Sequence, residues 1–274
     1  MRVIVLARAS VRHAISALRG RDVALWAAGL TFFAVLGLVP GLLLALRGAA
    51  ELVGSGVVRE GTAALAAALP PEHNAGAAVT TLTDAALGAS WPVLLAMLFP
   101  ASFYGEGLRR SLTQAADRRP GRFLGWKGRL GFLPVIVAGP VLVAAALALA
   151  PPIARRYVEG GWNTIAGIAV SFHVLWIAVS VAVALVYSTT ASTVIPHRWA
   201  VAGGLAIGTV LSGFLHGFLL FLAIPIDWSL PFAGLAAVGT TVALALWLYL
   251  LHLILIVGYR VLLSVHRVVT GGPE

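Results

Sequence analysis

The sequence lacks cysteine altogether and is poor in charge, since Asp, Glu, Lys and Arg make up only 11% of its 274 residues. The absence of cysteine excludes disulfides, thiolate metal sites and a cysteine nucleophile. Soluble domains carry roughly 25% charged residues, so the scarcity of charge argues against a water-soluble fold. Hydrophobic residues make up 60% of the chain, and they gather in long runs that suit a bilayer better than a soluble core.

Catalytic signatures are also missing. The sequence has no GxxxxGK[ST] phosphate loop, no HExxH helix and no GxSxG elbow. Its ten acidic residues are scattered, whereas a metal-dependent nuclease or phosphatase needs clustered carboxylates to hold its cation. We therefore expect no enzyme activity, no metal and no cofactor. The net charge of +9 is explained by basic residues at the ends of membrane helices, so no nucleic-acid partner is expected.

The predicted fold is all-α, a polytopic bundle of transmembrane helices that forms a single membrane domain. A helix rises 1.5 Å per residue, so about 20 apolar residues cross a bilayer. The second predicted span is interrupted by Pro92, Pro100 and Glu106. The six predicted spans cover about 24–46, 88–108, 130–151, 165–187, 199–224 and 232–262.

The distribution of Arg and Lys predicts the orientation. Alternate connections carry fifteen basic residues on one side and four on the other, the four being Arg47, Arg59, Arg155 and Arg156. Because the more basic side faces the cytoplasm, both termini are predicted to be cytoplasmic, which an even number of spans permits.

Two segments outside the spans have helical patterns. In residues 1–21, apolar residues recur every three or four positions and arginines occupy another face, which predicts a basic helix in the membrane interface or, alternatively, a solvated basic tail. The outer connection 47–87 contains two predicted short helices, about 62–69 and 75–87, separated by Pro70 and Pro71. These helices lie on the outer surface, cap a cavity, or form a compact connecting loop.

Small residues recur every four positions in the fifth span. Gly204, Gly208 and Ser212 place a narrow seam on one helix face, with His216 at its end. Such seams let two helix backbones approach closely in lipid, so plain helix packing is the leading interpretation. Gly37, Gly41 and Ala45 form a weaker seam in the first span.

Three histidines, His173, His216 and His252, fall within predicted spans. Ionisable side chains inside a membrane are costly and are candidates for function. His173 and His216 lie at similar predicted depth, so they either line an outward cavity together or are neutral rings bonded to a carbonyl or hydroxyl.

A charged cluster marks the inner end of the second span. Glu106 and Arg110 are four residues apart and can pair on one helix face. A basic collar around this cluster provides topology or binds a lipid phosphate, with Tyr104 and Trp126 as interface anchors; its basic residues are Arg109, Arg110, Arg122, Lys127 and Arg129.

Four segments together resemble the YihY/BrkB family of bacterial inner-membrane proteins. They are WAAGLTFFAVLGLVPGLLLAL from Trp26, FYGEGLRRSL from Phe103, PHRWAVAGGLAIG from Pro196 and FAGLAAVGTTVALALWLYLLHLILIVG from Phe232. The resemblance covers about residues 22–258. The chain departs from the family at the end of the last span, where Gly258, Tyr259 and Arg260 replace the usual Gly-Ala-Glu, so no role of that glutamate carries over.

The resemblance implies six spans, a multi-pass location in the bacterial plasma membrane, and lipid or lipopolysaccharide export in some members. From it and the basic collar we predict transport or handling of an anionic, amphipathic lipid of the envelope. A non-transporting scaffold, with a second copy or an envelope protein as partner, is the alternative. An older label for the family, tRNA-processing ribonuclease, has no residues here to support it.

Overall fold

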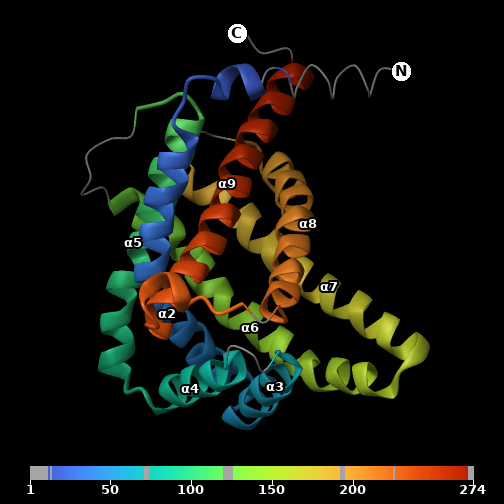
Figure 1. Ribbon diagram of the computed structural model, residues 1–274. Coiled ribbons are helices and arrows are strands. Elements are labelled where there is room, and N and C mark those ends of the chain that lie inside the picture. Colours follow the sequence, from blue (N-terminus) through green and yellow to red (C-terminus); the bar gives the residue numbers. More distant parts are fainter. Residues whose placement is uncertain are drawn as a thin grey trace.

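The computed structural model describes residues 12, 14–70, 74–119, 126–191, 195–224 and 226–270. Within these ranges all regular structure is helical (Figure 1), as the sequence predicts. Helix α2 (Val23–Val53) begins and helix α9 (Ala236–Thr270) ends at the same end of the bundle, which we call the terminal end. The opposite end is called the distal end.

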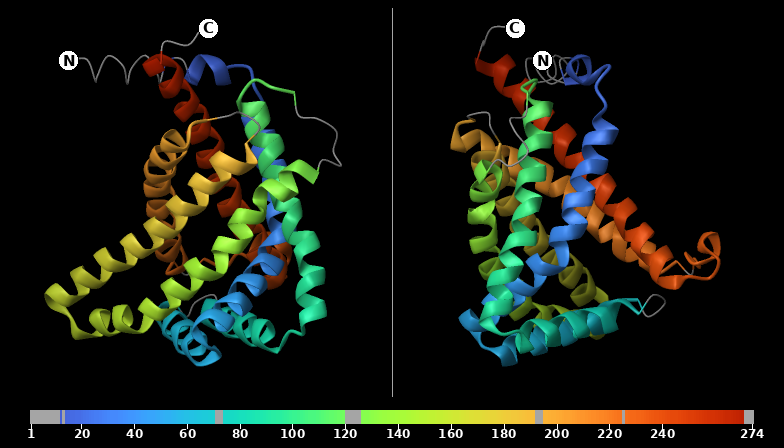
Figure 2. Two further views of the ribbon diagram at one scale, coloured as in Figure 1. Left: turned by 180° about the vertical axis from the view of Figure 1, so that it is seen from behind. Right: turned by 90° about the vertical axis from the view of Figure 1, so that its left-hand side faces the viewer.

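The other helices run between these two ends or lie across the distal one. Helices α3 and α4 lie across the distal end, and the hairpin of α6 and α7 projects away from α2 and α5 (Figure 2). Their bounds are α3 (Ser55–Ala68), α4 (Ala75–Gly88), α5 (Trp91–Ala115), α6 (Trp126–Glu159), α7 (Gly161–Leu185) with a π-helical turn (Val186–Thr190), α8 (His197–Leu222) and a 3₁₀ turn (Leu230–Phe232).

Caps and glycines determine where several helices begin and end. The Asp22 carboxylate accepts a hydrogen bond from the Leu25 N–H at 2.9 Å and caps α2, satisfying a donor that has no partner within the helix. Gly54, with φ +88°, separates α2 from α3, and Gly160, with φ +76°, separates α6 from α7. Glycine adopts this left-handed conformation without the steric cost that other residues meet.

Helices cover all six predicted spans, and five of them are long and apolar enough to cross a membrane: α2, α6, α7 with its π-helical turn, α8 and α9. Helix α5 has 25 residues but is not one of the five, since prolines, glycines and charged groups lower its hydropathy. The chain is thus an all-α protein with several membrane-spanning helices. The sixth span and the cytoplasmic termini stay predictions.

Several helices extend beyond the predicted spans or begin within them, and the membrane limits of the spans stay predictions. Helix α2 continues past residue 46 to Val53, where Gly54 with its positive φ follows it, and Arg47 and Glu51 pair on this added stretch at 2.8 Å. The predicted connection 152–164 is almost entirely helical, with Gly160 alone between α6 and α7. Helix α9 begins at Ala236 rather than at residue 232.

The two short helices of the outer connection are present as α3 and α4, although α3 begins earlier than predicted, at Ser55. Both helices touch the bundle, since α3 packs against α6 and α4 packs against α3 and α2. Of the predicted interfacial helix 1–21, residues 14–18 are helical. The rest of that prediction lies mostly outside the described residues.

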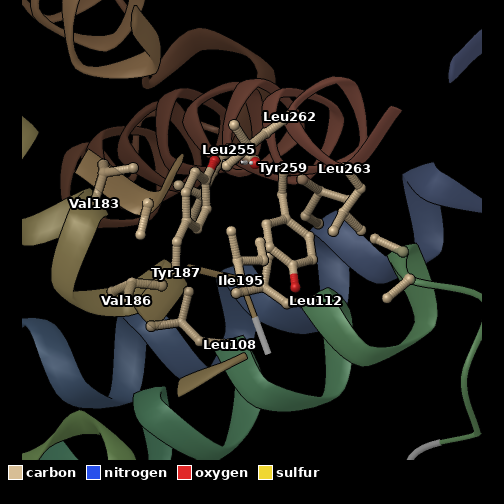
Figure 3. Close-up of a cluster of buried hydrophobic side chains, with 14 of the residues drawn as sticks. Leu108, Leu112, Val183, Val186, Tyr187, Ile195, Leu255, Tyr259, Leu262 and Leu263 are labelled. Carbon is tan, nitrogen blue, oxygen red and sulfur yellow. Dashed lines mark hydrogen bonds between the residues drawn. The ribbon is translucent and has the colours of Figure 1, made fainter. Parts of the chain in front are cut away.

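The main apolar core lies toward the terminal end. It joins α2, α5, α6, α7, α8 and α9, and its largest fully buried rings belong to Tyr187 and Tyr259, whose centroids are 5.0 Å apart (Figure 3). The Tyr187 hydroxyl also donates a hydrogen bond to the Leu255 carbonyl at 2.9 Å. Near the distal end the buried cluster is small: Ala49, Val58, Ala144 and Leu147. The bundle is therefore most tightly packed at its terminal end.

The absence of native cysteine makes the topology directly testable with single-cysteine variants. We predict that exposed positions Arg59 and Asp227, changed to Cys, react with a membrane-impermeant maleimide in intact cells. Exposed positions Arg19 and Lys127, changed to Cys, should react only after the membrane is disrupted. Labelling of Lys127→Cys from outside, with Arg19→Cys protected, would show that α5 does not cross the membrane.

Candidate functional site

A cavity of about 260 Å³ lies between α2, α5, α6 and α9. Its wall is apolar except for Tyr104 of α5 and His252 of α9, the two polar side chains among the residues that line it. Gly37 and Gly41 of α2 contribute part of the wall, so the weaker seam predicted in the first span borders open space as well as protein.

Three helices meet at His252 through hydrogen bonds between side chains. Its Nδ1 lies 2.9 Å from Oγ1 of Thr31 in α2, and its Nε2 lies 3.0 Å from the hydroxyl oxygen of Tyr104 in α5. His252 is only 3% exposed. Of the three predicted membrane histidines, this one connects separate helices at the edge of a cavity, which makes it the strongest candidate for function.

The hydrogen atoms of this group can be assigned from its partners. The Thr31 hydroxyl donates its one hydrogen to the Ala27 carbonyl at 2.8 Å, so it accepts a hydrogen bond from Nδ1–H of His252. A neutral imidazole then has a bare Nε2, which accepts from the Tyr104 hydroxyl. The result is a relay from Tyr104 through His252 and Thr31 to Ala27, in which every donor hydrogen has an acceptor.

The charged cluster of α5 contains the predicted pair of Glu106 and Arg110, together with a closer partner of Glu106, Arg109. Glu106 forms two hydrogen bonds with Arg109, at 2.9 Å and 2.7 Å, while the Arg110 guanidinium is 3.7 Å away. Glu106 is 1% exposed and packs directly against Gly128 of α6. Arg109 is therefore the main partner, because its fork-shaped guanidinium binds both carboxylate oxygens.

This pairing reduces the number of collar residues that are available to bind an anion. The charge of Arg109 is matched by Glu106, and Arg122 lies outside the described residues. Lys127 is exposed, and the Arg129 guanidinium lies 4.1 Å from the centre of the Phe103 ring and 5.1 Å from that of Trp126. The accessible basic part of the collar is thus the start of α6.

Tyr104 and Trp126 were both predicted to be interface anchors. Trp126 is 65% exposed, as an anchor requires. Tyr104 instead points inward to His252, so that part of the prediction is wrong. Its position within α5 could not reveal this, because the partner comes from a helix far along the chain.

A second charged group was missed by sequence reasoning. Arg260 of α9 is 2% exposed, and its guanidinium lies 2.7 Å from the Asp117 carboxylate and 3.0 Å from the Ala115 carbonyl. Asp117 also pairs with Arg21 at 2.9 Å. An arginine within a long apolar helix signals that a partner exists, since an unmatched buried charge is costly. The sequence does not show which carboxylate that partner is.

The other two membrane histidines bond to their own helices. Nδ1 of His173 lies 2.7 Å from the Ala169 carbonyl, and Nδ1 of His216 lies 2.9 Å from the Ser212 carbonyl. Neither residue lines the cavity beside His252. Phe172 stands next to both rings, with centroids 5.9 Å from His173 and 5.4 Å from His216.

The seam of the fifth span lies against α7. A β carbon on Gly208 would come within 2.9 Å of the Ser180 Cα, and one on Gly204 would come within 2.6 Å of the Ser180 carbonyl oxygen. Ser212 is fully buried. These contacts place the two backbones close together, as small residues allow in membrane helices.

The family described as virulence factor BrkB matches residues 14–273. The chain belongs to the BrkB family. Within it, the departure at Arg260 acquires a structural explanation, because the guanidinium at this position is bound by Asp117 at the end of α5. No curated protein and no solved structure matches the chain.

Within the described ranges, no three or more His, Asp or Glu side chains are grouped so that they could hold a metal ion. The candidate site therefore consists of the apolar cavity with its hydrogen-bonded relay, and of the basic residues at the start of α6.

Removing the partner of Arg260 should be costly. We predict that Asp117→Asn lowers the free energy of unfolding in detergent by about 3–5 kcal/mol, because it leaves a buried guanidinium without its anion. The matched control is Asp84→Asn, which breaks an exposed pair with Arg59 and should cost about 0–1 kcal/mol. Equal effects in the two variants would contradict the structural role of Arg260.

Changing glycine to alanine should affect stability differently at two positions of α8. Gly208→Ala should destabilise the protein by roughly 1–3 kcal/mol, because the added methyl group meets α7. Gly213→Ala, which has open space around its β carbon, should be neutral or stabilise by up to about 1 kcal/mol through helix propensity. Thermal unfolding of both variants in the same detergent measures the difference, and a harmless Gly208→Ala would rule out the close approach.

Proposed function

We propose that this BrkB-family protein binds and moves an anionic, amphipathic lipid of the bacterial envelope, working in the plasma membrane. The observation that carries the proposal is the accessible basic corner at the start of α6, formed by Lys127, Arg129 and the exposed ring of Trp126. Basic residues beside interfacial aromatic rings favour contact with anionic lipid head groups.

The surroundings of Arg129 favour an anionic ligand. Its guanidinium stacks against Phe99, Phe103 and Trp126, and no ion pair to a carboxylate occurs for it among the described residues. Aromatic rings orient an arginine without neutralising its charge, so its N–H groups remain suited to a phosphate. Arg109 is a poorer choice, since Glu106 already occupies its guanidinium.

The proposed orientation places this corner at the cytoplasmic leaflet. It requires α5 to cross the membrane as a sixth span, packed against α2 and α6. The excess of basic residues at the terminal end supports that orientation. A lipid bound at the corner would then enter from the cytoplasmic leaflet.

A scaffold that does not transport is the second candidate. It is favoured by the projecting hairpin of α6 and α7 (Figure 2), where Val158 is 88% exposed and Trp162 is 84% exposed. Such residues can contact another envelope protein or a second copy. Crosslinking through a photoreactive residue at position 162 in native membranes should then trap one partner in a fixed ratio. We expect neither enzyme activity nor nucleic-acid binding in either case.

The lipid proposal is tested by native mass spectrometry of protein purified in gentle detergent, with phosphatidylglycerol as the probe. We expect bound phosphatidylglycerol, and a loss of affinity of about thirtyfold when Lys127 and Arg129 are both changed to Ala, given about 1 kcal/mol for each basic residue near a membrane surface. Arg59→Ala, at the distal end, is the control and should leave binding unchanged.

Movement requires a separate measurement. Labelled phosphatidylglycerol should cross the bilayer of liposomes that contain the protein faster than that of empty liposomes. Binding without movement would favour the scaffold. The absence of both would argue against any lipid-handling role.

A further inference from the structure

We propose that the cavity beside His252 binds an uncharged lipid that carries a hydroxyl group, with the Tyr104 oxygen accepting its hydrogen bond. This site differs from the basic corner in place and in chemistry. The proposal holds whether or not the protein moves an anionic lipid.

The relay determines what the cavity offers a ligand. The Tyr104 hydrogen is used by His252, and both ring nitrogens of His252 are used by Tyr104 and Thr31. The Tyr104 oxygen keeps a further lone pair, because a phenol both donates and accepts. The polar side chains of the cavity wall therefore provide a hydrogen-bond acceptor and no donor. A ligand that bonds there has to bring its own hydrogen.

This chemistry excludes charged head groups. Tyr104 and His252 are the polar side chains of the wall, and in the relay both are neutral. A phosphate or carboxylate would lose its hydration and meet a lone pair, while an ammonium group would find no anion to match its charge. A hydroxyl group loses much less on leaving water and regains a hydrogen bond to Tyr104.

The volume of the cavity suits one apolar chain rather than a whole lipid. Its 260 Å³ is just below the roughly 300–1,000 Å³ of pockets that enclose drug-sized molecules. Gly41 is open toward this space, since no atom lies within 4 Å of a β carbon built on it. An apolar chain from the bilayer can occupy the cavity with its hydroxyl group at Tyr104.

The test uses dodecanol that carries a photoreactive diazirine, incubated with the full-length protein in detergent and located by peptide mapping. We expect labelling on α2 and α9 around the cavity. Unlabelled dodecanol should compete about fivefold better than its methyl ether, which lacks the hydrogen, because that is the net effect of one neutral hydrogen bond. Dodecanoate at neutral pH should compete no better than the ether. Equal competition by all three would overturn the proposal.

Two variants locate the site. Gly41→Leu fills the cavity and should reduce labelling at least about tenfold, while Gly29→Leu is the matched control, since it lies on the same helix with equally open space but does not line the cavity. Tyr104→Phe should remove the preference for the alcohol over the ether. Labelling that survives Gly41→Leu, or a preference that survives Tyr104→Phe, would overturn the assignment.

The two proposals fail separately. Lys127→Ala and Arg129→Ala, which abolish the basic corner, should leave dodecanol labelling unchanged. The competition among alcohol, ether and acid is measured on the unaltered protein, so the test does not depend on any variant folding.

Discussion

A guanidinium enclosed by protein has to be matched by an anion, because an unpaired charge in low-dielectric surroundings is costly. In this chain Arg260 of α9 imposes that requirement, and Asp117, just after α5, meets it. Because Asp117 also binds Arg21, the segment before α2, the end of α5 and the C-terminal half of α9 are held together. The apolar core of Tyr187 and Tyr259 lies beneath this contact, so the terminal end is closed by both charge and packing.

The distal half of the bundle has less buried apolar packing than the terminal end, since its buried cluster contains only small and aliphatic side chains from α2, α3 and α6. Helices α6 and α7 form a hairpin that projects away from α2 and α5 (Figure 2), and its exposed apolar side chains are compatible with lipid. Between the two ends lies the cavity, whose polar edge is formed by Tyr104 and His252 of the relay. The relay connects three helices at the level where the core ends.

The polar groups in the helices serve two different purposes. Arg109 and Glu106 satisfy one another within α5, so they strengthen the helix and leave little charge for a ligand. Lys127 and Arg129, in the first turn of α6, pair with no carboxylate among the described residues; Lys127 is exposed, and Arg129 is half-buried against aromatic rings. A basic collar that looks uniform in the sequence thus separates into a structural pair and an accessible corner. The histidines differ similarly: His252 bonds to two other helices, whereas His173 and His216 bond to their own.

The length and the patterning of the apolar segments by themselves determined that the chain is all-helical and approximately where its helices lie, because these are properties of neighbouring residues and of the solvent they require. The close approach of α8 to another helix also followed from the spacing of Gly204 and Gly208. Only the tertiary structure decided that Tyr104 binds His252, that Arg260 binds Asp117, and that Glu106 prefers Arg109 over Arg110. The first two contacts join segments far apart in the chain, and the third depends on side-chain geometry. Residue spacing alone specifies none of the three.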